Sequence, residues 1–329
     1  MEKVPSVLVI TPVRHIGGVS PILERIGAVT YLDHPSTADV VALVGGYDAV
    51  FTNPNKSNVF LGREVLAASR RLAAIATAST GTNHIDVADA RSRGIAVLSL
   101  TEERQVIDRI SSTAEHAFAL ALSAIRRIPQ AFDAVRRGEW DYVPFIGRQL
   151  DHLTAGVIGY GRLGSRFARY ARASFARVVA YDPYVQIRDD GVEQVDLELL
   201  LRECDVISLH THVTPETTGL LGRAAIAHLK SDVTLVNTSR GEVVDEEALV
   251  EFLAAHPQAM LASDVVTAEV SRKESSPLLR YARTATNVIL TPHIGGMTVE
   301  GQRLAYTHAA GMLEQFFVDR SRTTSAVKP

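Results

Sequence analysis

Residues 156–164 read Gly-Val-Ile-Gly-Tyr-Gly-Arg-Leu-Gly, and this run decides the fold of the middle of the chain. It ends an apolar strand and opens a helix that we predict over 162–173, and a second apolar strand then ends at Asp182. A strand, a glycine-rich turn, a helix and a strand with an acidic residue at its end make a dinucleotide-binding βαβ unit. The sequence therefore predicts a Rossmann-type parallel sheet in this part of the chain.

Each glycine of the turn has a physical reason. Gly159 permits the tight turn, Gly161 lets a pyrophosphate approach the backbone, and Gly164 lets the helix pack closely on the sheet. The N-terminus of the helix then faces the phosphates. Asp182 can accept hydrogen bonds from both hydroxyls of the adenosine ribose and would repel a 2′-phosphate, so we expect NAD rather than NADP as the cofactor.

Composition limits the class of protein. With 329 residues, of which 46% are hydrophobic, the chain can bury a full core and is expected to form two domains. Its formal net charge of −3 gives no reason to expect nucleic acid or an anionic membrane as a partner. No segment reaches the ~20 apolar residues of a membrane span, and the first residues do not resemble a signal peptide. We therefore expect a cytoplasmic protein.

Short apolar runs alternate with helical patterns along the whole chain, which is typical of a parallel α/β architecture. Before the glycine turn, the predicted strands span 7–10, 49–52, 72–76 and 95–98. After the nucleotide-binding unit, they span 206–209, 233–237, 260–264 and 288–290. With the two strands of that unit, the later group predicts a doubly wound sheet of six strands.

These patterns predict two α/β domains. A Rossmann domain over 111–296 is inserted in a smaller, flavodoxin-like substrate-binding domain made of 1–110 and 297–329. The last predicted helix, 299–317, has no strand after it and is expected to return to the domain of residues 1–110. The polar segment 320–329 is expected to fray.

In an open parallel sheet, ligands bind beyond the carboxyl ends of the strands. Three of these ends are followed by residue types that suit the reduction of a 2-keto acid, in chain order Arg240, Glu269 and His293. Arg240 can hold and polarise the substrate through a charge-assisted pair. His293 can protonate the carbonyl oxygen as hydride arrives. Glu269 can orient the imidazole and favour its cationic form.

Other motifs along the chain add to the glycine turn. They are Ser79-Thr80-Gly81-Thr82-Asn83-His84-Ile85-Asp86, Thr113-Ala114-Glu115-His116, Tyr181-Asp182-Pro183, Thr214-Pro215-Glu216-Thr217, Asn237-Thr238-Ser239-Arg240-Gly241 with Val244-Asp245, and the spacing of Asp264, Glu269 and Thr291-Pro292-His293. In these motifs the sequence resembles the D-isomer-specific 2-hydroxyacid dehydrogenases, the family that contains phosphoglycerate dehydrogenase and glyoxylate reductase. The resemblance covers nearly the whole chain.

The resemblance implies that Arg240, Glu269 and His293 are the catalytic set and that Asp264 contacts the nicotinamide amide. It also implies a homodimer, joined largely through the nucleotide-binding domains and the helix near 112–125. The residues expected to bind the cofactor are Tyr160, Gly161, Arg162, Leu163, Asp182, His210, Thr211, Thr238, Ser239, Asp264, His293 and Gly295.

By the same resemblance, the backbone amides of Thr80 and Gly81 hold the substrate carboxylate. The charged loop 98–109 replaces a shorter, neutral loop that is usual in the family, so Arg104 or Arg109 could bind a second anionic group on the substrate. Asn53 and Lys56 lie where relatives that act on phosphoglycerate carry basic substrate ligands, although the pattern matches only loosely.

The remaining histidines and the single cysteine give weaker signals. His210 and His212 have no accompanying ligands, so no metal site is predicted. His84 and His116 fit structural roles better than ligand roles. Cys204 cannot form an internal disulfide and is expected to be a buried, inert thiol.

Two alternatives to the dehydrogenase stay open. One is a phosphite or phosphonate-type dehydrogenase of the same family, which uses the same Arg, Glu and His and an anionic phosphorus substrate. The other is an NAD-sensing, corepressor-like binding protein that retains the triad. A formate dehydrogenase is disfavoured, because those relatives carry Gln in place of Glu269. The side chain of the substrate is not readable from the sequence, because variable loops recognise it.

Overall fold

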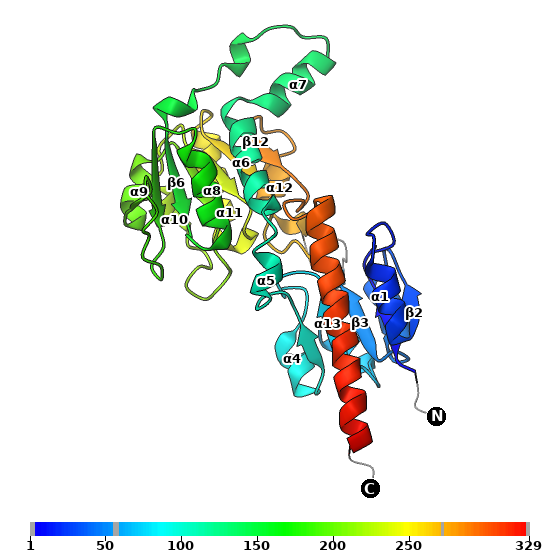
Figure 1. Cartoon of the computed structure of the whole chain (residues 1–329). Coiled ribbons are helices and arrows are strands. Elements are labelled where there is room, and N and C mark those ends of the chain that lie inside the picture. Colours follow the sequence, from blue (N-terminus) through cyan, green and yellow to red (C-terminus); the bar gives the residue numbers. More distant parts are fainter. Residues whose placement is uncertain (1–3, 55–58, 271–272, 327–329) are drawn as a thin grey trace. The chain divides into compact units, whose positions relative to one another are not determined.

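The computed structural model describes residues 4–54, 59–270 and 273–326. The chain divides into two compact units (Figure 1). The first unit comprises Met1–Ile110 and Met297–Pro329, and the second comprises Ser111–Gly296. The second unit is therefore an insertion between the two segments of the first.

The first unit is a parallel sheet with the strand order β2-β1-β3-β4-β5, which is the flavodoxin-like order. Its strands are β1 (Ser6–Val9), β2 (Ala28–Tyr31), β3 (Ala49–Thr52), β4 (Ala74–Thr77) and β5 (Ala96–Leu98). Its helices are α1 (Val19–Ile26), α2 (Thr37–Val44), α3 (Arg63–Ala68), α4 (Val87–Ser92), α5 (Arg104–Ile107) and α13 (Val299–Ala326).

Helices cover both faces of this sheet. Successive residues of β1 point to opposite faces, so Val9 joins the core under α1 and α13 while Leu8 joins the core under α2, α3 and α4. On the α13 side, Tyr306 packs on Phe51 of β3 with ring centroids 6.2 Å apart. The expected packing of the last helix on this domain is confirmed.

Two predictions for the first unit were wrong. Strand β2 was missed because it lies at the edge of the sheet and is only partly buried, so it lacks the apolar run of a central strand. Helix α13 continues to Ala326, so residues 320–326 are helical rather than frayed. Residues 327–329 lie outside the described part of the chain.

The second unit is a parallel sheet with the strand order β12-β11-β10-β9-β6-β7-β8. Its strands are β6 (Thr154–Ile158), β7 (Arg177–Tyr181), β8 (Glu193–Gln194), β9 (Val206–Leu209), β10 (Thr234–Asn237), β11 (Met260–Ser263) and β12 (Val288–Leu290). Its α-helices are α6 (Ser112–Ile125), α7 (Ile128–Arg136), α8 (Arg162–Arg172), α9 (Leu197–Glu203), α10 (Arg223–Ile226), α11 (Glu246–Ala255) and α12 (Pro277–Tyr281). Its 3-10 turns are η1 (Val143–Phe145), η2 (Leu150–His152), η3 (Gly241–Val243) and η4 (Lys273–Ser275).

This sheet is doubly wound, as predicted. The chain runs outward from β6 to β7 and β8, crosses back to β9, and then runs outward in the other direction. Within the described residues, this sheet has seven strands rather than the predicted six. The additional strand, β8, is an exposed edge strand of two residues, which is too short to leave an apolar pattern. The winding reverses between β6 and β9, which is where sheets of this kind bind their ligands.

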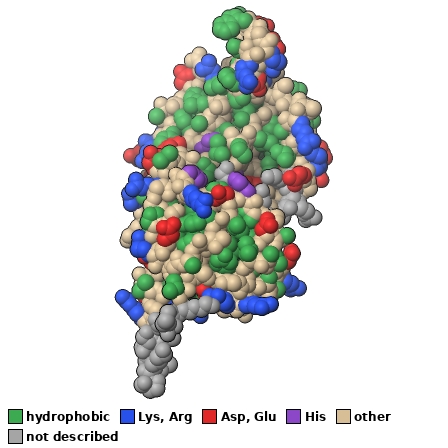
Figure 2. All heavy atoms as spheres, turned by 90° about the vertical axis from the view of Figure 1, so that its right-hand side faces the viewer, with side chains coloured by type: hydrophobic (Ala, Val, Ile, Leu, Met, Phe, Trp, Pro, Cys, Tyr) green, Lys and Arg blue, Asp and Glu red, His purple; other side chains and the backbone are tan. Residues whose placement is uncertain are grey.

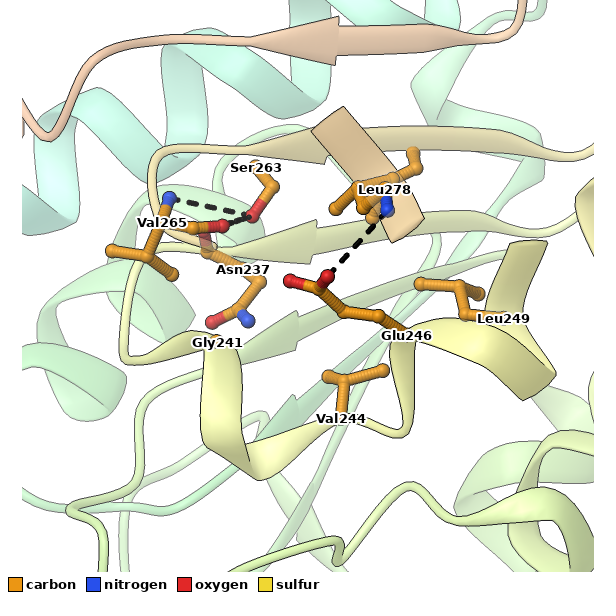
Figure 3. A pocket seen from close by; sticks show the side chains of 9 residues that line it. Asn237, Gly241, Val244, Glu246, Leu249, Ser263, Val265 and Leu278 are labelled. Carbon is orange, nitrogen blue, oxygen red and sulfur yellow. Dashed lines mark hydrogen bonds between the residues drawn. The ribbon is translucent and has the colours of Figure 1, made fainter. Parts of the chain in front are cut away.

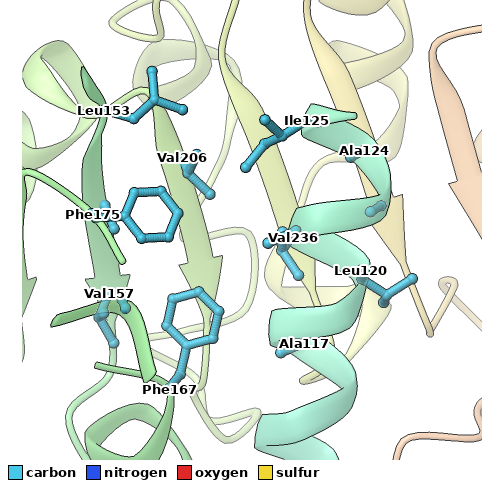
Figure 4. Close-up of a cluster of buried hydrophobic side chains, with 14 of the residues drawn as sticks. Ala117, Leu120, Ala124, Ile125, Leu153, Val157, Phe167, Phe175, Val206 and Val236 are labelled. Carbon is cyan, nitrogen blue, oxygen red and sulfur yellow. The ribbon is translucent and has the colours of Figure 1, made fainter. Parts of the chain in front are cut away.

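Helices α6 and α8 bury one face of the second sheet (Figure 4). Small residues on α6, such as Ala117 and Ala124, let that helix lie close to Val236 of β10. Phe167 of α8 is fully buried, and burial of a side chain of this size contributes about 1.5–3 kcal/mol. The other face is covered by α9, α10, α11 and α12. Within the described residues, no helix is both long and apolar enough to cross a membrane.

Candidate active site

The glycine turn has the geometry that its sequence predicts. Gly159 has a φ of 89°, and a Cβ atom there would lie 2.8 Å from the carbonyl oxygen of His210. A Cβ at Gly164 would lie 1.9 Å from the carbonyl oxygen of Gly159. At Gly161, which caps α8 without a side-chain hydrogen bond, a Cβ would meet nothing within 4 Å. The turn therefore packs tightly on two sides and leaves open space at the helix N-terminus, where a phosphate can bind.

Asp182 is fixed beside this turn. Its Oδ2 accepts a hydrogen bond from the backbone N–H of Tyr160 at 2.7 Å, and its Oδ1 accepts from the N–H groups of Tyr184 and Val185 at 2.9 and 3.2 Å. The Tyr160 hydroxyl donates to Asp189 Oδ2 at 2.6 Å, a contact that the sequence did not reveal. The carboxylate of Asp182 thus has a set position at the end of β7, although its bond to a ribose stays a prediction.

Three buried polar atoms lack partners at the ends of β9 and β10. They are His210 Nδ1, Thr211 Oγ1 and Thr238 Oγ1, and none has a hydrogen bond to another described residue. Burial lowers the pKa of His210 to about 3, so its ring is neutral. Its Nδ1 can then donate or accept a hydrogen bond, depending on the tautomer. Because buried polar groups normally have partners, a bound ligand with hydroxyl and amide groups would satisfy these atoms. These residues, with the glycine turn, fit NAD.

Asn237 shapes the turn that carries Arg240. Its Oδ1 accepts from the N–H and the hydroxyl of Ser239 at 3.0 and 2.8 Å, and its Nδ2 donates to the carbonyl oxygen of Arg240 at 2.9 Å. Arg240 Nη1 donates to the carbonyl oxygen of Ser239 at 2.7 Å. Burial lowers the pKa of Arg240, and Glu269 and Glu242 oppose that shift. A guanidinium in this setting remains a cation that can pair with a carboxylate.

Glu269 and His293 form a direct pair. Glu269 Oε1 lies 2.8 Å from His293 Nδ1, and the two side chains are 24% and 15% exposed. The backbone is strained at His293, which has a φ of 53°, and at Ala268, the residue before Glu269, which has a φ of 55°. Since the carboxylate engages Nδ1, the proton to be transferred belongs on Nε2. The structure thus brings together two residues that are 24 positions apart in the chain.

Asp264 anchors the segment that carries His293. Its Oδ1 accepts from Thr291 Oγ1 at 2.5 Å and from the N–H of Ile294 at 2.9 Å, while its Oδ2 accepts from the N–H of Gly295 at 2.7 Å. His116 Nε2 lies 3.3 Å from Oδ1. Burial raises the pKa of Asp264, but these hydrogen bonds outweigh it and hold the pKa below its ordinary value.

The role of Asp264 in this network was not predicted. The sequence suggested only a nicotinamide contact for Asp264 and a structural role for His116. His116 lies on α6 and also bonds Thr291 Oγ1 at 3.0 Å, so it joins the helix to the segment before His293. No pattern in the sequence connects these residues, because α6 and β12 are far apart in the chain. The nicotinamide contact of Asp264 stays a prediction.

In the first unit, the segment after β4 offers two backbone donors. Among the described residues, the N–H groups of Thr80 and Gly81 have no acceptor, while their carbonyl oxygens accept from Thr101 Oγ1 at 2.7 Å and Ser79 Oγ at 2.6 Å. The segment is therefore held by its carbonyls with its amides available, which suits an anion. That these amides bind a carboxylate stays a prediction.

The other substrate candidates differ in exposure. Asn53 is 1% exposed, and its Nδ2 donates to the carbonyl oxygen of Ala78 at 2.9 Å. Arg104 and Arg109 are exposed, and the predicted loop around them contains the one-turn helix α5. Their roles toward substrate also stay predictions. Lys56 lies outside the described residues.

The remaining candidates have structural surroundings. His84 is fully buried and its Nε2 lies 3.0 Å from Thr77 Oγ1. Burial raises the pKa of the Cys204 thiol to about 12, which keeps it protonated and unreactive. In the described part of the chain, no cluster of three His, Cys, Asp or Glu residues could hold a metal ion.

Residues 118–295 match the family model for the D-isomer specific 2-hydroxyacid dehydrogenase, NAD binding domain. The chain belongs to this family. The match contains the glycine turn and Asp182, as well as Arg240, Glu269 and His293. The matched residues make up most of the second unit. The match does not include the first unit, where Thr80, Gly81, Arg104 and Arg109 lie.

Individual members of the family are similar over most of the chain. The D-3-phosphoglycerate dehydrogenase of Archaeoglobus fulgidus is 38% identical over 270 residues, which are 81% of this chain and 49% of that protein. The hydroxypyruvate reductase of Thermotoga maritima is 36% identical over 240 residues, or 73% of this chain and 76% of that protein. The chain thus spans about half the length of the phosphoglycerate dehydrogenases that it matches.

A solved structure supports the same arrangement of elements. The D-lactate dehydrogenase of Aquifex aeolicus, complexed with NAD and lactic acid, has a TM-score of 0.79 and 26% identity to this chain. The similarity covers 98% of this chain and 99% of that one.

Proposed function

We propose that this protein is an NAD-dependent oxidoreductase that interconverts a 2-keto acid and a D-2-hydroxy acid. The observation that carries the proposal is the pair of Glu269 Oε1 and His293 Nδ1 at 2.8 Å, within Coulomb range of the partly buried cation Arg240. An arginine, a carboxylate and an imidazole at the carboxyl ends of neighbouring strands suit this reaction. The relatives, which include a D-3-phosphoglycerate dehydrogenase, a hydroxypyruvate reductase and a D-lactate dehydrogenase, support the same activity.

In the proposed mechanism, the glycine turn and Asp182 would hold NADH, which would supply the hydride that reduces the carbonyl carbon of the keto acid. Arg240 pairs with the substrate carboxylate and lies near the carbonyl oxygen, where negative charge develops. His293 gives the Nε2 proton to that oxygen, so that the product is a neutral hydroxyl. Glu269 stabilises the imidazolium before the transfer and holds the ring in place. In the oxidative direction, neutral His293 accepts the hydroxyl proton.

The experiment that tests the proposal is steady-state turnover with NADH and a panel of keto acids that differ in the charge of their side chains. If Arg104 and Arg109 bind a second anion, dicarboxylate or phosphorylated keto acids will be reduced better than pyruvate. Arg104→Ala or Arg109→Ala then removes that preference. If both variants are indifferent to substrate charge, the two arginines are only solvated. Phosphite with NAD belongs in the same panel, and absence of turnover throughout would favour an NAD-sensing binding protein.

Asp182 is expected to set the choice of cofactor. Its carboxylate has a fixed position next to the glycine turn, where it can bond the ribose hydroxyls and repel a 2′-phosphate. NADH should therefore give a higher kcat/KM than NADPH, and Asp182→Ala should narrow the gap mainly by weakening NADH. The measurement is kcat/KM for both cofactors with each protein. Equal use of NADH and NADPH by the unmodified protein would contradict this role.

We also propose that the protein is a homodimer in the cytoplasm. The segment from α7 to η1 exposes a group of large apolar side chains, with Phe132 61%, Trp140 90% and Tyr142 78% exposed. Hydrophobic side chains gather on this segment at the top of Figure 2. A second copy of the chain would remove these side chains from water. Sedimentation should give twice the chain mass, and Phe132→Asp should shift it toward the monomer. Cell fractionation tests the location.

A further inference from the structure

The loop that carries Glu269 is fastened to the segment that carries Arg240. Glu246, the first residue of α11, is 6% exposed and lines a small pocket together with Asn237 and Gly241 (Figure 3). Its Oε1 accepts a hydrogen bond from the N–H of Thr267 at 2.6 Å. Thr267 lies two positions before Glu269 in the chain.

The second carboxylate oxygen of Glu246 holds the far end of the same loop. Glu246 Oε2 accepts from Ser276 Oγ at 2.5 Å and from the N–H of Leu278 at 3.5 Å, and the latter bond is drawn in Figure 3. One buried carboxylate therefore binds both Thr267, soon after β11, and the residues at the start of α12. All of its partners are donors, which an acceptor-only group such as a carboxylate satisfies.

Two further contacts tie the same pair of segments. Glu242 Oε1 accepts from the N–H of Ala268 at 3.3 Å. A Cβ atom at Gly241 would lie 2.1 Å from the carbonyl carbon of Val266, so this glycine permits a backbone contact that any side chain would prevent. Gly241 and Glu242, the two residues after Arg240, thus contact the backbone of Val266, Thr267 and Ala268.

These contacts explain how the loop that carries Glu269 keeps an unfavourable backbone conformation. Ala268 has a φ of 55°, which a residue with a Cβ adopts only when its surroundings impose it. The bonds to Glu246 and Glu242 flank that residue and fix the direction in which the chain enters Glu269. The 2.8 Å contact between Glu269 and His293 depends on that direction.

We propose that Glu246 is a positioning residue, which acts through the backbone of Thr267 and Ala268 to hold Glu269 against His293. The inference rests on the proposed function, in which Glu269 and His293 move the proton. Among the described residues, the charged and titratable groups near this pair include Arg240 and Glu242 on the Glu269 side, and Asp264 after β11 and His116 on α6, which bond the segment that carries His293. All of them remain in a Glu246 variant.

The test compares Glu246→Ala with Glu247→Ala, which removes an exposed carboxylate from the next position of the same helix. Two quantities are measured in the full chain: amide hydrogen exchange of residues 266–270, and the pH profile of kcat/KM for keto-acid reduction. Glu246→Ala should speed exchange at Thr267 and Ala268 at least tenfold and lower kcat/KM on the order of tenfold to a hundredfold. The falling limb of its profile should move to lower pH, as in Glu269→Gln. Glu247→Ala should change neither quantity.

Two more variants separate positioning from general stability. In the double variant Glu246→Ala with Glu269→Gln, the falling limb of the pH profile should lie where it lies in Glu269→Gln alone. The charged contact between Glu269 and His293, through which Glu246 acts, is already lost in that variant. Glu246→Gln keeps an acceptor for Thr267, and the Ser276 hydroxyl can turn to accept from the new amide, so it should recover most of the profile. If Glu246→Ala does not fold, Glu246→Asp, which keeps the charge but is one methylene shorter, takes its place in both measurements.

The outcomes distinguish failure of this inference from failure of the proposed function. If the limb moves in Glu269→Gln but not in Glu246→Ala, the positioning role is overturned and the proposed function stands. Faster exchange spread evenly over the second unit, with additive effects in the double variant, also overturns it. If the limb moves in neither variant, the proton-transfer role of the pair is wrong, and local exchange at Thr267 still decides whether Glu246 holds the loop.

Discussion

His293→Ala is expected to nearly abolish turnover in both directions while NADH binding stays near normal. The imidazole is the group placed to give a proton to the carbonyl oxygen, and loss of a positioned general acid or base costs about a hundredfold to ten-thousandfold. Fluorescence titration measures NADH affinity, and kcat/KM is measured for reduction and for oxidation. A variant that keeps most of its turnover would remove His293 from the chemistry.

The pH dependence of the two directions follows from the same group. Reduction requires the imidazolium and is lost as pH rises through its deprotonation, while oxidation requires the neutral ring and is lost as pH falls. The Glu269 carboxylate, 2.8 Å from Nδ1, stabilises the imidazolium by Coulomb attraction. Glu269→Gln removes the charge but keeps the shape, so the imidazolium loses this Coulomb stabilisation.

The expected result of Glu269→Gln therefore has a definite sign. The falling limb of the reductive kcat/KM profile should move to lower pH, and oxidation should extend to lower pH as well. The measurement is the pair of profiles for the unmodified protein and the variant. An unmoved reductive limb would mean that Glu269 is not coupled to the proton donor, and the roles of Glu269 and His293 would have to be given up.

Arg240→Lys is expected to lower kcat/KM by on the order of a hundredfold or more. A guanidinium can pair with a carboxylate through two parallel N–H groups and still lie near the carbonyl oxygen, whereas an ammonium is a point charge on a flexible stem. The turn around Arg240 is held by Asn237, so the variant keeps its backbone.

Two measurements separate the roles that Arg240 could have. Steady-state kinetics with the best keto acid gives the loss in kcat/KM, and fluorescence titration gives NADH affinity, which should stay near that of the unmodified protein. If the lysine variant lost NADH affinity and kept catalysis, Arg240 would be a cofactor ligand instead.

The elements that were predicted correctly are those whose signals are local. The glycine turn, helix α8 and the central strands of the second sheet each follow from residues that are neighbours in the chain. A fully buried parallel strand reads as a short apolar run, as β10 does, so its position is visible without the tertiary structure. Strands β2 and β8 were missed because neither forms an apolar run: β2 includes Thr30 and Tyr31 and is partly exposed, and β8 consists of the exposed Glu193 and Gln194.

The candidate site also contains residues that could be named from local sequence and contacts that could not. Arg240, Glu269 and His293 could be named from sequence because each follows a strand, and parallel strands end at one edge of a sheet. The way in which other residues hold these three in place could not be predicted. His116 and Asp264 come from different elements, and Glu246 has the sequence pattern of an ordinary acidic residue in the first turn of a helix.

By itself, the sequence determined the type of fold, the family and the residue types that suit the chemistry, because these depend on spacing along the chain and on which residues avoid water. Only the tertiary structure decided which donors meet which acceptors. The bond between Glu246 and Thr267 joins residues 21 positions apart, and that between Asp264 and Gly295 joins residues 31 positions apart. Such bonds depend on how neighbouring strands are aligned and on the path of the loops between them. A buried carboxylate must find its donors within about 3 Å, and only the folded backbone places them there.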